Sequence, residues 1–467
     1  MAKFYITTSI AYANAKPHIG FALESIQADV LARYHRTEGD DVFFLTGTDE
    51  HGTKNYKTAR ESKKDPQDFV DENSKKFQEL TEKLSISNDY FIRTSDQKKH
   101  WPTVIKFWKQ LDEKGDIYKK KYAGKYCSGC EAFVLEKDIK NNQCQIHQRE
   151  LETVEEENYF FRLSKYTDRL KKIYQEDKLE IVPRSRKREV LSILDDIDDL
   201  SVSRSREKLP WGIPVPGDET QTIYVWVDAL SNYISGADNS YWPADVHCIG
   251  KDILKFHAIY WPAILLSLEI ALPKALFVHG FITADGQKMS KSLGNVIDPF
   301  ELIKKYGVDA VRYYLLREIS PTEDGDFSLE RFKERYNSDL ASGIGNLVSR
   351  VITMARNRGF EDARIPKIDK AIEITHKKYK EALAHYRFND ALIEIWKLIS
   401  TCDKIIEKER PWEGSSPKTL GALLDTIDKI ADLLSPFLPE TSEKIRKEVE
   451  RSNKLKNKKK ENLFERL

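Results

Sequence analysis

Two short segments of this chain carry residues suited to binding phosphate groups. In the first, Pro17-His18-Ile19-Gly20 joins an apolar run to a stretch with apolar residues at helical spacing. A helix N-terminus offers free N–H groups and partial positive charge to an anion, and a glycine there lets the ligand approach the backbone. His18 can donate to a phosphate oxygen. The alternative is that His18 only caps the helix while Gly20 packs.

The second segment is Lys288-Met289-Ser290-Lys291-Ser292, which is flanked by Gly286 and Gly294. A loop of this kind can close over a polyphosphate. Its two ammonium groups, on Lys288 and Lys291, would stabilise the negative charge that builds up on a leaving pyrophosphate. The alternative is an exposed, solvated lysine loop.

A cluster of cysteines and a histidine forms a third candidate site. Cys127 and Cys130 are followed, after a gap, by Cys144 and His147, with two residues inside each pair. Four sulfur or nitrogen ligands in so short a segment suit a closed tetrahedral zinc site, which is structural rather than catalytic. Unrelated free cysteines are the alternative. The two remaining cysteines are expected to be small core residues: Cys248 and Cys402.

The elements that must position these sites alternate between strands and helices in the first third of the chain. Residues 3–9 predict a strand, 11–17 a loop, 18–36 a helix and 40–48 a second strand, and one long amphipathic helix is expected to follow through residue 84. This β-α-β order indicates a parallel sheet with helices on its faces.

The alternating pattern breaks near Gly115. Residues 116 to about 215 carry short strand-like pieces, the cysteine cluster and a turn rich in proline and glycine, and the alternation then resumes. One α/β domain is therefore expected to be split by an insertion. After Asp298-Pro299, which predicts a helix start, three long amphipathic stretches at 338–357, 370–409 and 417–450 predict an all-α helical bundle.

Composition narrows the classes of protein and partner. The chain has 467 residues and a net charge of +1, so two to four domains are expected and any polyanion must be bound by local patches. No stretch approaches the roughly 18 apolar residues of a membrane span. The N-terminus enters a predicted strand directly, and the few cysteines fit a reducing compartment, so we expect a cytoplasmic protein.

The two phosphate-binding segments, in this order and context, resemble the signature motifs of class I aminoacyl-tRNA synthetases. That family has a His-Ile-Gly-His type motif after its first strand and a Lys-Met-Ser-Lys-Ser motif after the second half of its nucleotide-binding fold. This sequence departs from the family at Phe21, where the family has a histidine. The resemblance then implies that adenylation depends more on His18 and on the lysine loop.

Further segments are similar to the methionyl branch of this family, and the similarity runs from residue 3 to about 440. It is carried by the segments 9–20, 46–54, 198–204, 211–217, 224–233, 250–265 and 279–299. It implies an α/β Rossmann-like nucleotide-binding domain split by a zinc-containing connective insertion and followed by an all-α C-terminal bundle. The implied limits are 1–115 and 223–284 for the two catalytic halves, 116–222 for the insertion, 285–337 for the lysine loop and linking helices, and 338–467 for an anticodon-binding bundle.

The residues themselves suit a methionine site, because a polarizable thioether pairs well with aromatic rings. The resemblance implies methionine binding by Ile10, Tyr12, Trp226, Leu230, Tyr233, Phe256 and His257, with His257 and Tyr12 near the sulfur and Asp49 on the α-amino group. For ATP, which binds with Mg²⁺, it implies His18, Gly20, Glu24, Gly250, Asp252, Ile282, Lys288 and Lys291. His18, Lys288 and Lys291 are the expected catalytic residues.

The resemblance also implies a tRNA partner. Asn346 and Arg350 share one helix face because they lie four residues apart, and Trp412 follows a helix end beside Arg410. The family reads the CAU anticodon of initiator and elongator tRNA(Met) at these positions, where an exposed tryptophan can stack on an unpaired base; packing of Trp412 against the bundle is the alternative. The insertion is too short for a separate editing domain, and a monomer is expected.

Three alternatives stay open at this stage. A cysteinyl-type class I synthetase would bind zinc through ligands from distant segments, whereas these ligands are clustered. A non-catalytic tRNA-binding relative remains open because of Phe21. A small-molecule nucleotidylyltransferase can share the histidine motif but has no need of the bundle and the zinc insertion.

Overall fold

The computed structural model describes residues 1–127, 132–134, 139–144, 150–237, 240–284, 286–289, 295–414, 416–454 and 463–467. The chain forms two compact units. The first unit comprises Met1–Pro17, Gly39–Thr81 and Ser87–Val278, and the second comprises His18–Glu38, Glu82–Ile86 and His279–Leu467.

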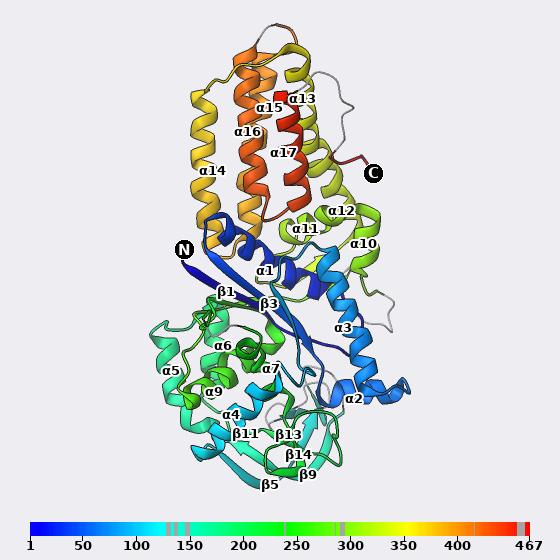
Figure 1. Cartoon of the computed structure of the whole chain (residues 1–467), viewed down its shortest axis with the longest axis vertical. Helices are drawn as coiled ribbons and strands as arrows, with labels where there is room; N and C mark the ends of the chain where they lie inside the picture. The colour runs from blue at the N-terminus through cyan, green and yellow to red at the C-terminus, as the bar shows by residue number, and fades with distance from the viewer. Residues whose placement is uncertain are drawn as a thin grey trace. The chain divides into compact units, whose positions relative to one another are not determined.

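A seven-stranded sheet forms the centre of the first unit (Figure 1). Its order is β10-β16-β15-β1-β3-β2, with β4 also pairing with β3, and β1–β15, β1–β3, β2–β3, β3–β4 and β10–β16 are all parallel. The predicted parallel sheet is therefore confirmed. The strands are β1 (Lys3–Thr8), β2 (Ala11–Tyr12), β3 (Asp41–Asp49), β4 (Tyr90–Arg93), β10 (Glu180–Val182), β15 (Val246–Gly250) and β16 (Ala275–His279).

Two predictions for the first unit are wrong in detail. The expected loop at 11–17 begins with β2, whose Ala11 and Tyr12 pair with the end of β3. The expected long helix through residue 84 is two helices, α2 (Gly52–Glu61) and α3 (Pro66–Lys83). The break falls where Lys63 has φ 55° and Asp65 Oδ1 accepts a hydrogen bond from Gln67 N at 2.8 Å, so a proline and a side-chain cap restart the helix.

Helices packed against this sheet bury one contiguous core. On α4 (Trp101–Glu113) the buried residues Val104, Phe107, Trp108 and Leu111 recur at helical spacing and face α9 (Trp261–Leu268). Each buried side chain of this size contributes about 1.5–3 kcal/mol of hydrophobic free energy. The remaining helices of the unit are α5 (Thr167–Gln175), α6 (Arg184–Leu194), α7 (Val225–Leu230) and α8 (Asn232–Ser235).

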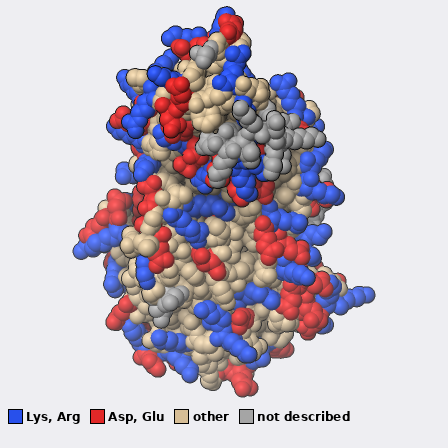
Figure 2. Space-filling model, turned by 45° about the horizontal axis from the view of Figure 1, so that its top comes forward, with Lys and Arg blue, Asp and Glu red and all other residues tan. Residues whose placement is uncertain are grey.

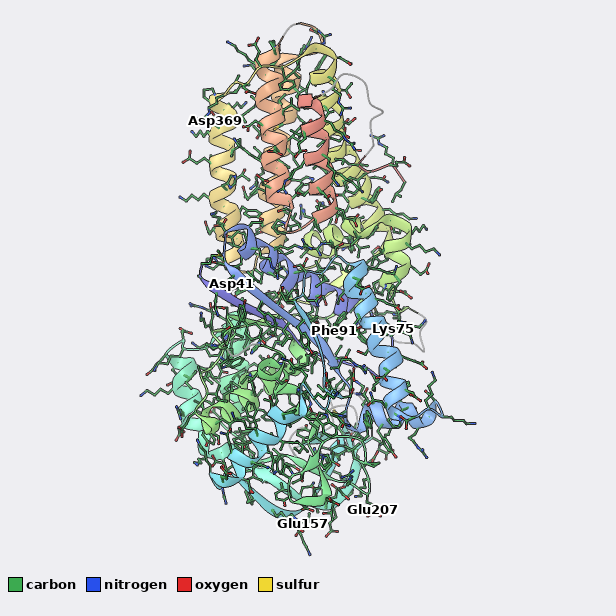
Figure 3. All side chains as sticks on the ribbon, in the orientation of Figure 1. Asp41, Lys75, Phe91, Glu157, Glu207 and Asp369 are labelled. Atoms are coloured by element: carbon green, nitrogen blue, oxygen red, sulfur yellow. The ribbon has the colours of Figure 1, made fainter. Side chains whose placement is uncertain are left out.

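Short strands are confirmed in the region expected to be an insertion, together with two long ones. β5 (Ile117–Cys127) and β9 (Glu152–Phe161) pair antiparallel, with solvent-exposed side chains such as Glu157 (Figure 3). The others are β6 (Ala132–Val134), β7 (Ile139–Lys140), β8 (Gln143–Cys144), β11 (Leu200–Ser201), β12 (Ser203–Ser205), β13 (Pro214–Val215) and β14 (Asp218–Ile223).

The second unit is mainly helical, as predicted, and its last helices lie side by side (Figure 1). The three expected stretches are in fact five α-helices preceded by a π-helical segment, η6 (Tyr336–Gly345). Tyr386, with φ 57°, divides the second stretch and Pro439 restarts the third. The five are α13 (Asn346–Arg358), α14 (Pro366–Ala384), α15 (Phe388–Glu409), α16 (Pro417–Leu434) and α17 (Pro439–Lys454).

The rest of the second unit includes the described part of the segments expected to bind phosphate. It contains α1 (Ile19–Thr37), α10 (Pro299–Tyr306), α11 (Val308–Arg317), α12 (Leu329–Arg335) and a small sheet of β17 (Ile282–Ala284), β18 (Gln287–Lys288) and β19 (Gly325–Phe327). The predicted start of α10 is confirmed, because Asp298 Oδ1 accepts from Phe300 N at 2.8 Å.

Charge on the surface is mixed. Figure 2 shows Lys and Arg side chains interspersed with Asp and Glu over the face in view, in keeping with the net charge of +1. Among the helices of the described ranges, none combines the length and apolar character needed to cross a membrane.

Candidate functional site

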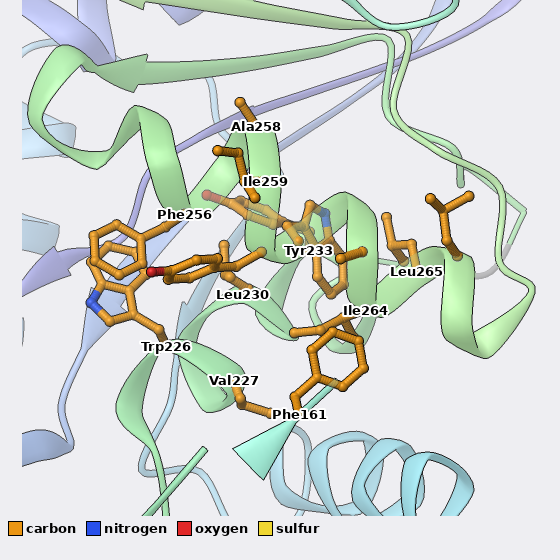
Figure 4. Packing of buried hydrophobic residues seen from close by; sticks show 14 of the residues in the cluster. Phe161, Trp226, Val227, Leu230, Tyr233, Phe256, Ala258, Ile259, Ile264 and Leu265 are labelled. Atoms are coloured by element: carbon orange, nitrogen blue, oxygen red, sulfur yellow. The ribbon is translucent and has the colours of Figure 1, made fainter. Parts of the chain in front are cut away.

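Aromatic side chains from three segments of the first unit meet beside α7. The rings of Trp226 and Phe256 are stacked (Figure 4), with centroids 3.6 Å apart and planes 9° apart. Tyr12 meets Trp226 edge-on at a centroid distance of 6.4 Å. Phe256 begins a π-helical turn, η4 (Phe256–Tyr260), and such turns are frequent at functional sites. Leu230 is buried in the same cluster, against which Ile10 packs. Of the apolar residues predicted for methionine, the structure therefore brings together Tyr12, Trp226, Leu230 and Phe256.

A neutral polar pair lies within this cluster. His257 Nε2 is 2.7 Å from Tyr233 Oη, and His257 Nδ1 is 3.0 Å from the carbonyl oxygen of Ile253. Because the carbonyl can only accept, Nδ1 carries the proton and Nε2 accepts from the tyrosine hydroxyl. Burial lowers the pKa of His257 to about 4. The imidazole is therefore uncharged near neutral pH, which suits an apolar thioether.

The other candidates of the first unit follow the carboxyl ends of its parallel strands. Asp49 is the last residue of β3, is 3% exposed, and its carbonyl accepts from Asn55 Nδ2 at 2.9 Å. Gly250 ends β15 and is followed by a 3-10 turn, η3 (Lys251–Ile253), that contains Asp252. Parallel strands bring their carboxyl ends to one edge, where open α/β sheets bind their ligands.

In the second unit, His18 is the N-cap of α1. Its Nδ1 accepts from Gly20 N at 3.0 Å, and a Cβ at Gly20 would lie 2.8 Å from the His18 ring. The capping alternative therefore describes the geometry correctly, and it does not exclude phosphate binding, because a neutral ring that accepts at Nδ1 carries its proton on Nε2. Phe21 is buried on α1 at 7% exposure.

Glu24 is paired with a histidine that the sequence did not point to. Its Oε2 lies 2.7 Å from His279 Nε2, while His279 Nδ1 is 2.8 Å from the carbonyl oxygen of Gly280. Both ring nitrogens thus lie within hydrogen-bonding distance of oxygen atoms. Ile282 is buried on β17, and the backbone of Lys288 pairs with Thr283. Lys291 lies outside the described residues.

The residues expected to contact an anticodon meet on the bundle. Asn346 opens α13 and is exposed, and Arg350 follows one turn later. The Arg350 guanidinium carbon lies 5.9 Å from the centre of the Trp412 ring, and Trp412 is 40% exposed. Arg358 donates to the backbone carbonyl of Trp412. The segment is therefore held by its backbone while the indole faces solvent beside a cation.

Half of the predicted zinc ligands can be placed. Cys127 ends β5 and Cys144 ends β8, and both are buried in one small cluster with Leu151. Cys130 and His147 lie outside the described residues, within which no group of three or more metal-binding side chains occurs. Cys248 and Cys402 are fully buried, as predicted.

One buried polar network was missed by reasoning from the sequence. Asp228, on α7 between two predicted pocket residues, binds His51 and His100 from distant parts of the chain. An acidic residue inside an otherwise apolar helix was the only available signal.

Comparison with known proteins agrees with this arrangement. The model of the family "tRNA synthetases class I (M)" matches residues 4–139 and 134–352, and that of the "Anticodon-binding domain of tRNA ligase" matches 367–465. Together with the parallel sheet and the helical C-terminal region, these matches define a class I aminoacyl-tRNA synthetase.

The particular family follows from curated relatives and solved structures. The methionine–tRNA ligase of Thermotoga maritima is 45% identical over 96% of this chain and 75% of its own length, and that of Rhizobium meliloti is 42% identical over 95% and 90%. Mycobacterium tuberculosis methionyl-tRNA synthetase in complex with methionyl-adenylate has a TM-score of 0.91 at 37% identity, covering 96% of this chain and 93% of that one. The chain belongs to the methionine–tRNA ligase family, and the alternatives kept open above are not favoured.

Proposed function

We propose that this chain activates methionine with ATP to methionyl-adenylate and pyrophosphate, and then transfers methionine to the 3′-terminal adenosine of tRNA(Met). The observation that carries the proposal is the stacked pair of Trp226 and Phe256 beside the neutral pair of Tyr233 and His257. An unbranched thioether fits such an aromatic, uncharged wall, and a polar or charged side chain does not. The methionyl-adenylate complex of the Mycobacterium tuberculosis relative supports the same substrate.

Each end of methionine has its own group in this proposal. Ile10, Tyr12, Trp226, Leu230, Tyr233, Phe256 and His257 hold the side chain. Asp49 binds the α-ammonium through a charge-assisted hydrogen bond, because a buried carboxylate at a strand end is a strong acceptor for a cation. The substrate carboxylate is left to react.

ATP is bound by both backbone and side-chain groups in this proposal. Gly250 and Asp252 bind adenosine, with Glu24 and Ile282 contributing. His18, Gly20, Lys288 and Lys291 bind the phosphates, and Mg²⁺ that accompanies ATP would neutralise part of their charge. His18 suits this role because its Nε2 carries the proton while its Nδ1 caps α1.

The reaction needs no protein nucleophile. The methionine carboxylate oxygen attacks the α-phosphorus in line, the bond to the β-phosphate oxygen breaks, and pyrophosphate leaves. The 2′-hydroxyl of the terminal adenosine of the tRNA then attacks the carbonyl carbon of the adenylate, and AMP leaves. His18, Lys288 and Lys291 stabilise the charge that develops on the phosphates, so positioning and electrostatics supply the rate.

A structural zinc ion in an insertion at 116–222 is part of the proposal. The donor set of Cys127, Cys130, Cys144 and His147 suits tetrahedral zinc, and the burial of Cys127 and Cys144 in one cluster supports it. One ion per chain would hold β5 and β8 together. The catalytic halves are assigned to 1–115 and 223–284, and the lysine loop with its linking helices to 285–337.

The bundle at 338–467 is proposed to bind the anticodon of initiator and elongator tRNA(Met). Asn346, Arg350 and Trp412 would contact its bases, with the exposed indole as a stacking platform beside a guanidinium. The enzyme is proposed to act as a monomer in the cytoplasm.

Amino-acid-dependent pyrophosphate exchange tests the central claim. With a panel of amino acids, methionine alone should support rapid exchange, and both initiator and elongator tRNA(Met) should be charged. Preferred activation of cysteine would replace the claim with a cysteinyl activity. Retained tRNA binding without any exchange would indicate a non-catalytic relative.

A further inference from the structure

Asp228 joins three separate parts of the first unit through one carboxylate. Its Oδ2 lies 2.7 Å from Nδ1 of His51, and its Oδ1 lies 2.7 Å from Nε2 of His100. His100 in turn bonds Ser235 of α8 through Nδ1, at 2.7 Å. The side chains of Asp228, His51 and His100 are at most 3% exposed, so water does not compete for these bonds.

The position of Asp228 on α7 separates this network from the pocket wall. Trp226 and Leu230 are four residues apart, so they lie on one face of the helix. Asp228 stands between them in sequence and therefore points away from that face. One side of α7 contacts the proposed thioether site, and the other side is fixed by the two histidines.

His51 connects the same carboxylate to the proposed ammonium site. It stands two residues after Asp49, at the N-cap of α2, between the rings of Trp101 and Trp211 at 5.8 and 5.4 Å. Trp211 Nε1 donates to the carbonyl oxygen of Glu50 at 2.6 Å. These contacts and the bond to Asp228 together hold the segment that follows β3 in place.

The carboxylate between the histidines is held in its charged form. Burial alone would raise the pKa of Asp228, but the charge of His51 and the hydrogen bonds from both histidines lower it. An ionised oxygen accepts stronger and shorter hydrogen bonds than an amide oxygen does. The Asp228 link is therefore stiffer than a neutral residue of the same shape could make it.

We propose that Asp228 is a positioning residue which sets the distance between the two ends of the methionine site, because it holds the α7 wall and the segment after Asp49 at once. This inference rests on the proposed function of Asp49 and of the α7 residues. Asp228 itself touches no substrate. Its loss should therefore weaken ligands that need both ends of the site and spare ligands that need one.

Two probes that differ only by an amino group separate these cases. Methioninol carries the thioether and the ammonium, and 4-(methylthio)butan-1-ol carries the thioether alone. In Asp228→Asn, methioninol should bind about tenfold more weakly, the size of one lost charge-assisted contact, while the alcohol should change less than about twofold. Both constants are measured as inhibition of methionine-dependent pyrophosphate exchange.

A double-mutant cycle tests whether Asp228 acts through Asp49. The variant Asp49→Asn with Asp228→Asn should bind methioninol no worse than Asp49→Asn alone, within about twofold, because coupled residues are not additive. If the loss of methioninol affinity in the double variant equals the product of the losses in the two single variants, the proposal is wrong. The probe ratio is the inhibition constant of methioninol divided by that of the alcohol. If this ratio is the same in Asp228→Asn as in wild type, the proposal is also wrong.

A conservative exchange and a matched control exclude general damage. His51→Asn keeps a donor where His51 Nδ1 lies and should preserve the probe ratio, whereas His51→Ala should shift it as Asp228→Asn does; these two variants also decide the question if Asp228→Asn does not fold. The control is Asp116→Asn, since Asp116 is another buried carboxylate of the first unit, bonded to Lys165 and Ser267. Asp116→Asn should lower stability and leave the ratio unchanged.

The outcomes distinguish this inference from the proposed function. If wild-type protein shows no methionine-dependent exchange, the function fails. If exchange is present and Asp49→Asn binds methioninol normally, the assignment of Asp49 fails and this inference fails with it. If Asp49→Asn weakens methioninol binding and Asp228→Asn does not, the inference alone is wrong.

Discussion

The guanidinium of Arg312 lies 2.7 Å from the carboxylate of Asp29, and neither side chain is exposed to solvent. Arg312 also donates to the carbonyl oxygens of Leu84, Pro436 and Phe437 at 2.8–3.0 Å. One side chain therefore ties α11 to α1, to residues 82–86 and to the turn between α16 and α17. The helix that begins after His18 is fixed to the bundle within the second unit.

Replacing Arg312 with methionine should destabilise the second unit by about 3–5 kcal/mol, because it leaves the buried charge of Asp29 and three carbonyl groups without this partner. Urea unfolding measures the change in free energy. Arg33→Met is the matched control: Arg33 also binds Asp29, at 2.8 Å, but it is 25% exposed, so a loss of about 1 kcal/mol is expected. Equal losses of unfolding free energy in the two variants would show that burial of the Arg312–Asp29 pair adds nothing to stability.

Lys291→Ala should lower the rate of methionine-dependent pyrophosphate exchange by about 100-fold, with little change in the KM for methionine. The reason is that the ammonium group would act on charge that appears only in the transition state. Lys304 on α10 is exposed and serves as the control lysine. An unchanged exchange rate in Lys291→Ala would reject the catalytic assignment of the loop.

Trp412→Ala should weaken tRNA(Met) binding by about 5- to 150-fold, the range of one lost base stack, and leave pyrophosphate exchange intact. Aminoacylation kinetics at varied tRNA concentration measure the effect. Ile374→Ala, at a similarly exposed position of α14 (43%), should change neither activity. If Trp412→Ala charges tRNA as wild type does, the indole has no part in recognition.

Purified protein should contain one zinc ion per chain, and Cys144→Ser should lose most of it, because a serine hydroxyl is a poor replacement for a thiolate ligand. Cys402→Ser, which alters a buried cysteine of the bundle, should retain the metal. Mass spectrometry of the metal content decides the matter. If wild-type protein contains no zinc, the clustered cysteines are ordinary core residues and the zinc proposal is wrong.

The sequence predicted the elements whose signals are local. Asp298-Pro299 marks a helix start that the structure confirms, and the order of strands and helices around His18 predicted a parallel sheet. The break between α2 and α3 also has a local signal in Asp65-Pro66, where the Asp65 side chain caps the new helix. No local signal in the sequence marks the break at Tyr386, because tertiary packing determines where a non-glycine residue adopts a positive φ.

The missed parts of the site depend on contacts between distant residues. His51 and Asp228 are 177 positions apart, and Glu24 and His279 are 255 apart. Each histidine alone is compatible with a capping or surface role, and no periodicity links it to its carboxylate. The partner of His257 was likewise settled only by the fold, which places the Tyr233 hydroxyl against its ring.

The uncharged state of His257 predicts how stability should depend on pH. Burial lowers its pKa from 6.5 to about 4. Between these pH values the imidazole is therefore protonated in the unfolded chain and neutral in the folded chain. Stability contributed by this group is therefore full above pH 6.5 and is lost as the pH falls toward 4. The lowering of the pKa from 6.5 to about 4 corresponds to about 3 kcal/mol.

His257→Gln removes this titration while keeping an amide that can donate and accept. Urea unfolding of both proteins at pH 7 and near pH 4.5 gives the test. Wild type should lose about 2–3 kcal/mol more than His257→Gln on acidification, because only wild type has to exclude a proton from the pocket. Burial is the main cause of the lowered pKa of His247 and acts in both proteins, so that part cancels in the comparison; only the smaller effect of the His257 charge on His247 is removed with the imidazole. Equal losses would mean that the His257 imidazole is protonated in the folded state, and a charged group beside the stacked pair of Trp226 and Phe256 would not suit a thioether.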